Sequence, residues 1–235
     1  MREENRNQIS IRNTIYETKK VKIMKIIWLG HSSFLIESER GIKIITDPFD
    51  ETLGYKLPRI KANIVTVSHE HFDHNYVRGV KGRPVVFKGL INRESHKMEF
   101  RGISSYHDSV YGGKRGPNTI FVIKADGLSL CHLGDLGHIL NPDKLAEIGK
   151  VDILFIPVGG FYTINSSQAT QIIKDIKPKI AVPMHYKTEA IKFSIDPVDV
   201  FLSNKNNIQR LESSEFEITE NTLPKNPQIY VLQYE

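Results

Sequence analysis

The feature that most constrains this chain is a run of histidines and acids directly after a short apolar stretch. Residues 64–68 (Ile-Val-Thr-Val-Ser) are mostly apolar and β-branched, which predicts a buried strand. Residues 69–74 then read His-Glu-His-Phe-Asp-His. Imidazoles and carboxylates are the usual ligands of zinc, and alternate positions of an extended chain lie on one face. The pattern therefore predicts a metal site, and a merely solvated loop is the weaker interpretation.

Three later positions supply the further donors that a closed two-metal site needs. His107 lies at a predicted strand end, Asp135 closely follows an apolar stretch at 128–132, and His185 follows another at 180–183. A rigid sheet holds side chains at the ends of its strands in fixed positions. We therefore expect these three side chains to meet the histidine run of residues 69–74.

The rest of the chain alternates strand and helix signals. Apolar and β-branched runs predict strands at 25–29, 34–37, 42–46, 85–87, 120–124, 128–132, 153–157, 180–183 and 229–233. Asn141-Pro142-Asp143 and Asn165-Ser166-Ser167 open two predicted helices, which run to about 148 and 176. Residues 203–222 are polar and predict a loop or hairpin. The pattern favours an α/β (α+β) domain over 24–235 with two sheets covered by helices.

The order of these motifs resembles the metallo-β-lactamase superfamily. The resemblance covers about residues 24–190 and rests on GHSSFLIE at 30–37, TDPF at 46–49, the HxHxDH run, a single His, a Gly-Asp pair and a late His. It is strongest to the small metal-dependent hydrolases that include ascorbate-6-phosphate lactonase and the N-acyl-phosphatidylethanolamine phospholipase D core. The resemblance implies a four-layer αββα sandwich with its site at one edge between the sheets.

The resemblance also implies a role for each donor. It places His69, His71 and His107 on one ion, Asp73, His74 and His185 on a second, and Asp135 between them. Asp73 and Asp135 are then the catalytic carboxylates, with Asp73 orienting a hydroxide shared by the two ions. Zinc is the expected metal, although manganese, iron or nickel suits the same ligands. The implied reaction is hydrolysis of a small ester, lactone or phosphodiester.

Four further residues are candidates for substrate contacts or for supporting the ligands, each with a structural alternative. His31 faces the substrate or makes a structural hydrogen bond, and His132 supports the site or is a core histidine. His138 lines the pocket or lies outside it. Tyr162 follows Gly159-Gly160, which either brings a loop close to the substrate or forms a plain turn.

Two other features have an open interpretation. Asp47, in Thr-Asp-Pro-Phe, is expected to buttress the metal loop rather than to bind metal. Residues 114–116 (Lys-Arg-Gly) lie near His107, where they either meet an anionic substrate or form a solvated loop.

Charge and spacing argue against a nucleic-acid enzyme of the same fold. The net charge is +5, but residues 1–22 contribute six Lys or Arg against three Glu, so the body is nearly balanced. Only 27 residues separate His107 from Asp135 and 49 separate Asp135 from His185, which leaves no room for an RNA-clamping domain. A non-catalytic metal-binding module remains an alternative, but no expected ligand is missing. A diiron oxidoreductase is disfavoured, because such proteins resemble an HxExD motif and this chain has His71 in place of its glutamate. A true β-lactamase is also disfavoured, because its second metal is held by a set that includes cysteine and the set expected here has none.

The remaining expectations concern location and ends. Cys131 is the only cysteine, no apolar run reaches the ~18 residues of a membrane span, and the N-terminus lacks the apolar core of a signal peptide. These features favour the cytoplasm. Residues 1–23 are expected to be an extension, because Met24 opens a typical strand, and the sequence leaves open whether they are ordered. It also leaves a homo-oligomer open.

Overall fold

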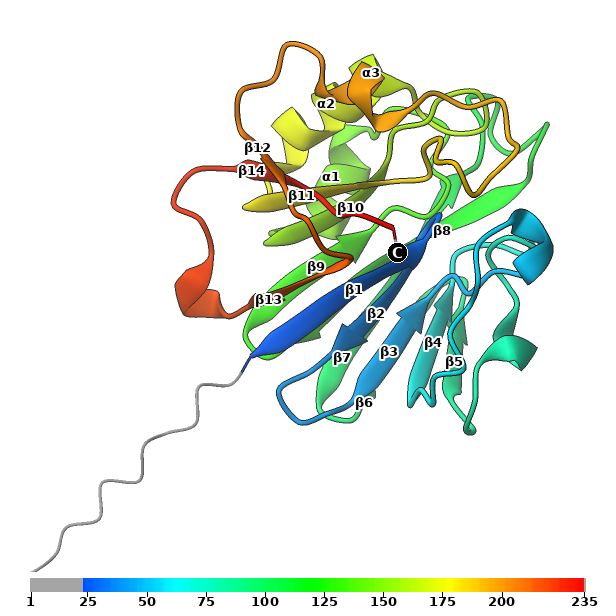
Figure 1. Ribbon diagram of the computed structural model, residues 1–235, viewed down its shortest axis with the longest axis vertical. Helices are drawn as coiled ribbons and strands as arrows, with labels where there is room; N and C mark the ends of the chain where they lie inside the picture. The colour runs from blue at the N-terminus through cyan, green and yellow to red at the C-terminus, as the bar shows by residue number, and fades with distance from the viewer. Residues whose placement is uncertain (1–22, 235) are drawn as a thin grey trace, which may run out of the picture.

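Two β-sheets lie face to face in the computed structural model, which describes residues 23–234 (Figure 1). The predicted extension at 1–23 therefore falls outside the described residues except at its last position. The first sheet has the order β13-β1-β2-β3-β4-β5. Its strands are β1 (Met24–Gly30), β2 (Ser33–Glu37), β3 (Lys43–Thr46), β4 (Ile64–Val67), β5 (Val85–Lys88) and β13 (Glu215–Ile218).

The second sheet has eight strands in the order β12-β14-β11-β10-β9-β8-β7-β6. They are β6 (Ile91–Ser95), β7 (Met98–Tyr106), β8 (Pro117–Ala125), β9 (Leu128–His132), β10 (Ile153–Pro157), β11 (Ile180–Met184), β12 (Ile208–Arg210) and β14 (Gln228–Val231). Strands β9, β10 and β11 are mutually parallel, so their carboxyl ends reach the same edge.

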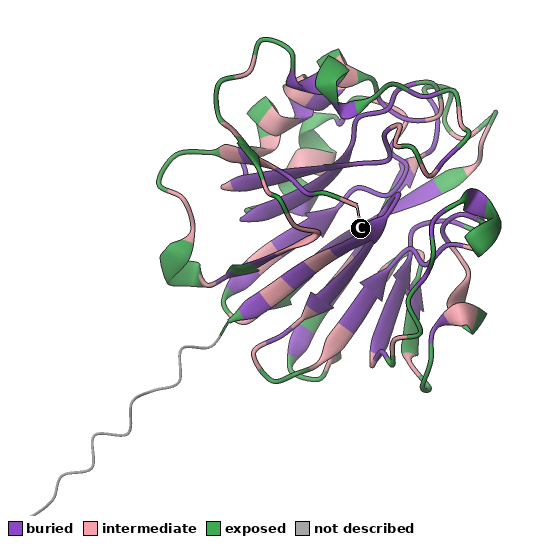
Figure 2. Ribbon diagram, viewed as in Figure 1, coloured by how far each residue is buried: buried purple, intermediate pink, exposed green. Residues whose placement is uncertain are grey.

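Strands β3 and β4 of the six-stranded sheet are buried on both faces because they carry apolar residues at consecutive positions (Figure 2), whereas the edge strand β5 is mostly exposed. Successive side chains point to opposite faces. Ile44 and Ile64 belong to the large core shared with the other sheet. Ile45 and Val65 belong to a second cluster, which also contains Phe49, Leu53 and Tyr55. The sheet is therefore a middle layer with a core on each side.

The two outer layers differ in content. Helices α1 (Pro142–Ile148), α2 (Ser166–Ile176) and α3 (Val198–Leu202) gather on the side of the eight-stranded sheet (Figure 1). Asn141 and Asn165 cap the first two as predicted. Within residues 23–234, the second cluster is closed by loops and by the 3₁₀ turns η1 (Glu51–Leu53) and η2 (Val77–Gly79). The predicted sandwich is confirmed, but in the described residues the layer outside the six-stranded sheet consists of loops and 3₁₀ turns rather than α-helices.

The polar segment 203–222, for which a loop or hairpin was expected, contains two strands that do not pair with each other. Strand β12 pairs with β14 in the eight-stranded sheet, whereas β13 pairs with β1 in the other. The segment also ends in a third 3₁₀ turn, η3 (Glu220–Thr222). It therefore crosses from one sheet to the other and ties them together. No helix among residues 23–234 has the length and hydropathy to cross a bilayer.

Candidate metal centre

The predicted donors meet at one edge of the sandwich because each follows a strand that ends there. The run at 69–74 closely follows β4 of the six-stranded sheet, whereas His107, Asp135 and His185 follow β7, β9 and β11 of the other. Ligand atoms from the two sheets come within 4.8 Å of one another in three overlapping groups. These groups are His69, His71 and His107; His69, His74 and Asp135; and His31, Asp73, His74 and His185.

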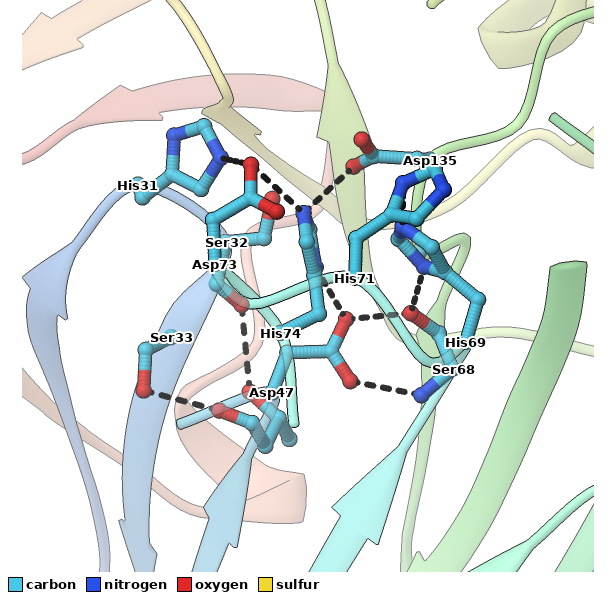
Figure 3. A network of polar contacts seen from close by, with 12 residues as sticks. His31, Ser32, Ser33, Asp47, Ser68, His69, His71, Asp73, His74 and Asp135 are labelled. Atoms are coloured by element: carbon cyan, nitrogen blue, oxygen red, sulfur yellow. Dashed lines mark hydrogen bonds and ion pairs between the residues drawn. The ribbon is translucent and has the colours of Figure 1, made fainter. Parts of the chain in front are cut away.

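The carboxylate of Asp135 is the centre of this cluster. Its Oδ2 lies 3.1 Å from Nε2 of both His107 and His185, and its Oδ1 lies 3.3 Å from Nε2 of His74. Figure 3 shows the chain of contacts that continues from His74 to Asp73. Asp135, His74 and His185 are buried. One carboxylate therefore faces imidazoles on both of its oxygens.

Asp47 fixes the histidine run through hydrogen bonds to the residue directly before it and to its last residue. Its Oδ1 accepts from the backbone N–H of Ser68 at 2.7 Å, and its Oδ2 accepts from Ser68 Oγ at 2.5 Å and from His74 Nδ1 at 2.9 Å. Ser68 Oγ also lies 2.9 Å from His69 Nδ1 (Figure 3). With these Nδ1 atoms as donors, both imidazoles turn Nε2 toward the cluster. Asp47 buttresses the loop, in agreement with the sequence interpretation.

The backbone is strained at three points around the cluster. His31, Asp47 and His185 have φ angles of 51°, 40° and 51°, in the left-handed region that non-glycine residues rarely adopt. Gly134 has φ 56°, and a Cβ there would lie 2.3 Å from Asn118 Oδ1. Such strain is typical of sites in which the surrounding structure fixes the geometry.

The two buried acids of the cluster are held in their charged form. Burial alone would raise the pKa of Asp135, but His185 and His74 outweigh it and hold this pKa well below its usual range. Burial likewise opposes ionisation of Asp73, and the charge of His74 with the hydrogen bond from His31 lowers its pKa. The cluster therefore keeps two carboxylates available as ligands at neutral pH.

The histidines of the cluster differ in the direction of their pKa shifts because their surroundings differ. Burial lowers the pKa of His69 to about 3 and that of His31 to about 4. Burial acts in the same direction on His74, but Asp135 and Asp73 raise its pKa well above the ordinary value. His31 and His69 are thus neutral at pH 7, which for His69 is the form that metal ligation requires, whereas His74 carries the proton that a bound cation would displace.

The four candidates without an assigned ligand role lie in different surroundings. His31 is fully buried, with Nε2 3.2 Å from Asp73 Oδ2 (Figure 3). His132 is also buried; its Nε2 donates to the carbonyl of residue 32 at 2.7 Å, and its Nδ1 accepts from the N–H of residue 134 at 3.1 Å. His138 accepts from the N–H of residue 106 and lines another cavity. Tyr162 lines the cavity at the cluster.

Asn118 is a supporting residue that the sequence interpretation missed. Its Oδ1 accepts from the N–H of Asp135 at 3.0 Å, and its Nδ2 donates to Leu133 O at 2.9 Å and to Ser105 Oγ at 2.7 Å. It lies on β8, which pairs with both β7 and β9. A buried polar residue between the strands that precede His107 and Asp135 was the available signal.

A cavity of about 540 Å³ opens onto the cluster. Its wall combines donors of the cluster with an arginine and three aromatic rings: Glu70, His71, Phe72, Asp73, His107, Arg115, Asp135, Tyr162, His185 and Phe193. Volumes of this size admit small molecules. The cluster is therefore buried on the protein side and reachable from one cavity.

The fold and the cluster define an α/β sandwich with a candidate metal site at its open edge. A family model described as the Beta-lactamase superfamily domain matches residues 25–185. The chain belongs to this superfamily, and within it the chain is a metal-dependent hydrolase. This conclusion confirms the resemblance read from the motifs.

Individual relatives support the same assignment. A UPF0173 metal-dependent hydrolase of Carboxydothermus hydrogenoformans is 33% identical over 196 residues, covering 70% of this chain and 85% of the relative. One from Thermoplasma volcanium is 31% identical over 192 residues, covering 70% and 84%. A Thermotoga maritima crystal structure, assigned to the Zn-dependent hydrolases of the metallo-beta-lactamase superfamily, is 37% identical with TM-score 0.77, covering 90% of this chain and 100% of that one.

Proposed function

We propose that the chain is a hydrolase with two divalent metal ions, zinc in the first place, acting on a small ester, lactone or phosphodiester. The observation that carries the proposal is the position of Asp135, whose two carboxylate oxygens face imidazoles from both sheets. One oxygen is near His74 and the other is near His107 and His185. A carboxylate placed in this way suits a bridge between two ions.

The chemistry of the donor set fits such a pair of ions. His69, His71 and His107 group on one side and Asp73, His74 and His185 on the other. Among the described residues, Asp135 Oδ1, His74 Nε2, His107 Nδ1 and His185 Nδ1 are buried atoms with no hydrogen-bond partner. Buried polar atoms are normally satisfied. Two of these, Asp135 Oδ1 and His74 Nε2, face the cluster, where a cation would satisfy them.

The second group contains His31 in addition to the ligands that we assign. Its Nε2 contacts Asp73 Oδ2, and His31 is fully buried and outside the lining of the cavity. We therefore propose that His31 orients Asp73 rather than touching substrate. Bound ions would supply Lewis acidity and a water of lowered pKa. Asp73, which lines the cavity, would accept a hydrogen bond from the attacking water and fix its direction.

The cavity supports a small substrate. Its lining includes the aromatic side chains of Phe72, Tyr162 and Phe193 together with the carboxylates of the cluster. Tyr162 is half-buried and provides contact area for the substrate. We also propose a cytoplasmic location, because Cys131 is the only cysteine and is free and buried.

Elemental analysis of protein purified without chelator tests the proposal. We expect about two zinc or manganese ions per chain, and a lower content in Asp135→Ala, because the bridge is lost. Asp143→Ala, an exposed acid at the start of α1, is the matched control and should retain the wild-type content. A screen of lactones, phosphodiesters and thioesters follows. Two irons would point to redox chemistry, and no metal even after zinc is added would contradict the proposal.

A further inference from the structure

The loop after His107 is folded around a single carboxylate. Asp108 is buried, and its Oδ1 accepts from the N–H groups of Val110 and Gly112 at 2.8 and 2.9 Å. Its Oδ2 accepts from the N–H groups of Lys114 and Arg115 at 2.9 and 2.8 Å. Four charge-assisted hydrogen bonds to one side chain fix the backbone of the loop. The backbone of Arg115 therefore has a defined position next to a metal ligand.

The side chain of Arg115 lies against two aromatic rings, of which Tyr162 belongs to the wall of the cavity and Phe161 does not. Its guanidinium carbon is 5.4 Å from the ring centre of Tyr162 and 6.0 Å from that of Phe161. A cation–π contact of this kind restricts the guanidinium and does not use up its N–H groups, which remain able to donate. Arg115 lines the cavity that also contains His107, Asp135 and His185. It lines an adjoining hollow of about 530 Å³ as well.

The guanidinium has no anionic partner within residues 23–234. Glu70 is the acid in the wall that lies outside the cluster, and it is engaged by Lys88 Nζ at 2.8 Å and by Asn75 Nδ2 at 3.0 Å. The acids of the cluster face histidines instead. Arg115 is thus a half-buried, oriented and unpaired cation beside the site where substrate must bind.

We propose that Arg115 determines specificity by binding a second, non-reacting carboxylate or phosphate group on the substrate. The inference rests on the proposed hydrolytic function and narrows its substrate class to anionic esters or lactones. Guanidinium binds planar oxyanions through two parallel hydrogen bonds, which a lysine cannot reproduce. From the sequence alone, residues 114–116 fit either a substrate contact or a solvated loop, and the anchoring by Asp108 favours the substrate contact.

A matched pair of esters tests the charge preference. Mono-4-nitrophenyl glutarate and 4-nitrophenyl pentanoate have acyl chains of equal length and differ by a terminal carboxylate in place of a methyl group. We expect zinc-loaded wild type to prefer the glutarate ester in kcat/KM. In Arg115→Gln this preference should fall about 10- to 100-fold, because a hydrogen bond to a charged group is lost. Arg115→Lys should recover only part of it.

Lys114→Gln is the control, since it removes the same charge from the adjacent exposed position and keeps the backbone bond to Asp108. It should retain the wild-type preference. An equal preference in wild type and Arg115→Gln would overturn the proposal while leaving the hydrolytic function intact. An equal loss in Lys114→Gln would also overturn it, because the effect would then be general electrostatics.

Binding provides a readout that does not depend on turnover. Calorimetry with 3-phenylpropanoate and with phenyl phosphate on zinc-loaded protein should show about 10-fold or more weakening in Arg115→Gln for the anion that the site takes. The anion whose binding weakens more in the variant shows whether Arg115 recognises a carboxylate or a phosphate. Failure of the zinc-loaded protein to hydrolyse any ester would count against the proposed function. Unchanged binding of both anions by Arg115→Gln would instead refute the role of Arg115.

Discussion

The base and the mouth of the cavity are built in opposite ways. The base is the buried cluster around Asp135, His74 and Asp47, each of which exposes 1% or less of its surface. The mouth consists of Phe72, Arg115, Tyr162 and Phe193, which are exposed or half-buried. Both environments occur within the HxHxDH run, since His74 is buried and Phe72 is 52% exposed. If the proposed function holds, we expect the base to determine the chemistry and the mouth to determine which molecule reaches it.

The difference in burial predicts how each part responds to change. A buried residue with several hydrogen bonds has no solvent to replace its partners, so its loss affects folding and metal binding together. Truncation of a half-exposed residue at the mouth changes the unfolding free energy only slightly. Substitutions at the base should therefore change metal content and stability, and substitutions at the mouth should change only the response to substrate.

The largest effect is expected at Asp47. Asp47→Ala removes the acceptor of three hydrogen bonds that join Ser68 and His74. Loss of one partner of a buried charged pair costs about 3–5 kcal/mol of unfolding free energy, and loss of such a support weakens metal affinity about 10- to 100-fold. Denaturant unfolding and competition with a zinc chelator measure the two quantities.

The isosteric variant Asp47→Asn keeps the fold testable if the alanine variant fails to fold. It retains one carbonyl acceptor, so it should weaken metal binding with a smaller loss of stability. Zinc affinity equal to wild type in Asp47→Asn would show that the histidine run holds its geometry without this carboxylate.

Lowering the pH should destabilise the buried base of the cavity, because its neutral histidines resist protonation in the folded protein. Burial lowers the pKa of His31 to about 4, so between pH 6.5 and 4 the unfolded chain binds a proton that the folded chain does not. The unfolding free energy of metal-free protein should therefore fall as pH decreases through this window. His31→Gln should show a shallower fall, and chemical denaturation at several pH values measures both slopes. Identical slopes would mean that His31 is not held neutral by burial.

An intermediate effect is expected at Asn118, which connects the strands that lead into His107 and Asp135. Asn118→Ala leaves the N–H of Asp135 and the carbonyl of Leu133 without their partner, at a cost of about 1–3 kcal/mol. We expect lower metal content under chelator competition together with this loss. Asn92→Ala, on the exposed face of β6, is the control and should change neither measurement. A matching loss in both variants would assign the effect to the sheet rather than to the site.

Much of this base could be predicted from the sequence because its donors occur in short motifs at strand ends. The eight-stranded sheet was harder, since β6 and β7 have few consecutive apolar residues and β6 is mostly exposed. The connection at 203–222 was read as a loop or hairpin because local composition does not reveal that β12 and β13 pair with different sheets. Asn118 was missed, and residues 114–116 were left open, because their contacts cross the fold and spacing along the chain cannot show them.

The smallest effect is expected at Phe72, and it tests the separation of base and mouth most directly. Phe72 sits between His71 and Asp73 in the sequence, yet its side chain lines the cavity at 52% exposure. Phe72→Ala should change the unfolding free energy by no more than about 0.5 kcal/mol and leave metal content unchanged. KM for esters with an aromatic group should rise a few-fold, because one wall of contact is lost.

Tyr111→Ala is the matched control for Phe72→Ala, because Tyr111 is 84% exposed and lies outside the lining of the cavity. Its KM values should equal those of wild type. If Phe72→Ala instead loses metal, then the aromatic side chain contributes to the geometry of the ligands on either side of it. The base and the mouth would then be coupled, and a substitution that changes substrate specificity at position 72 would also lower metal binding.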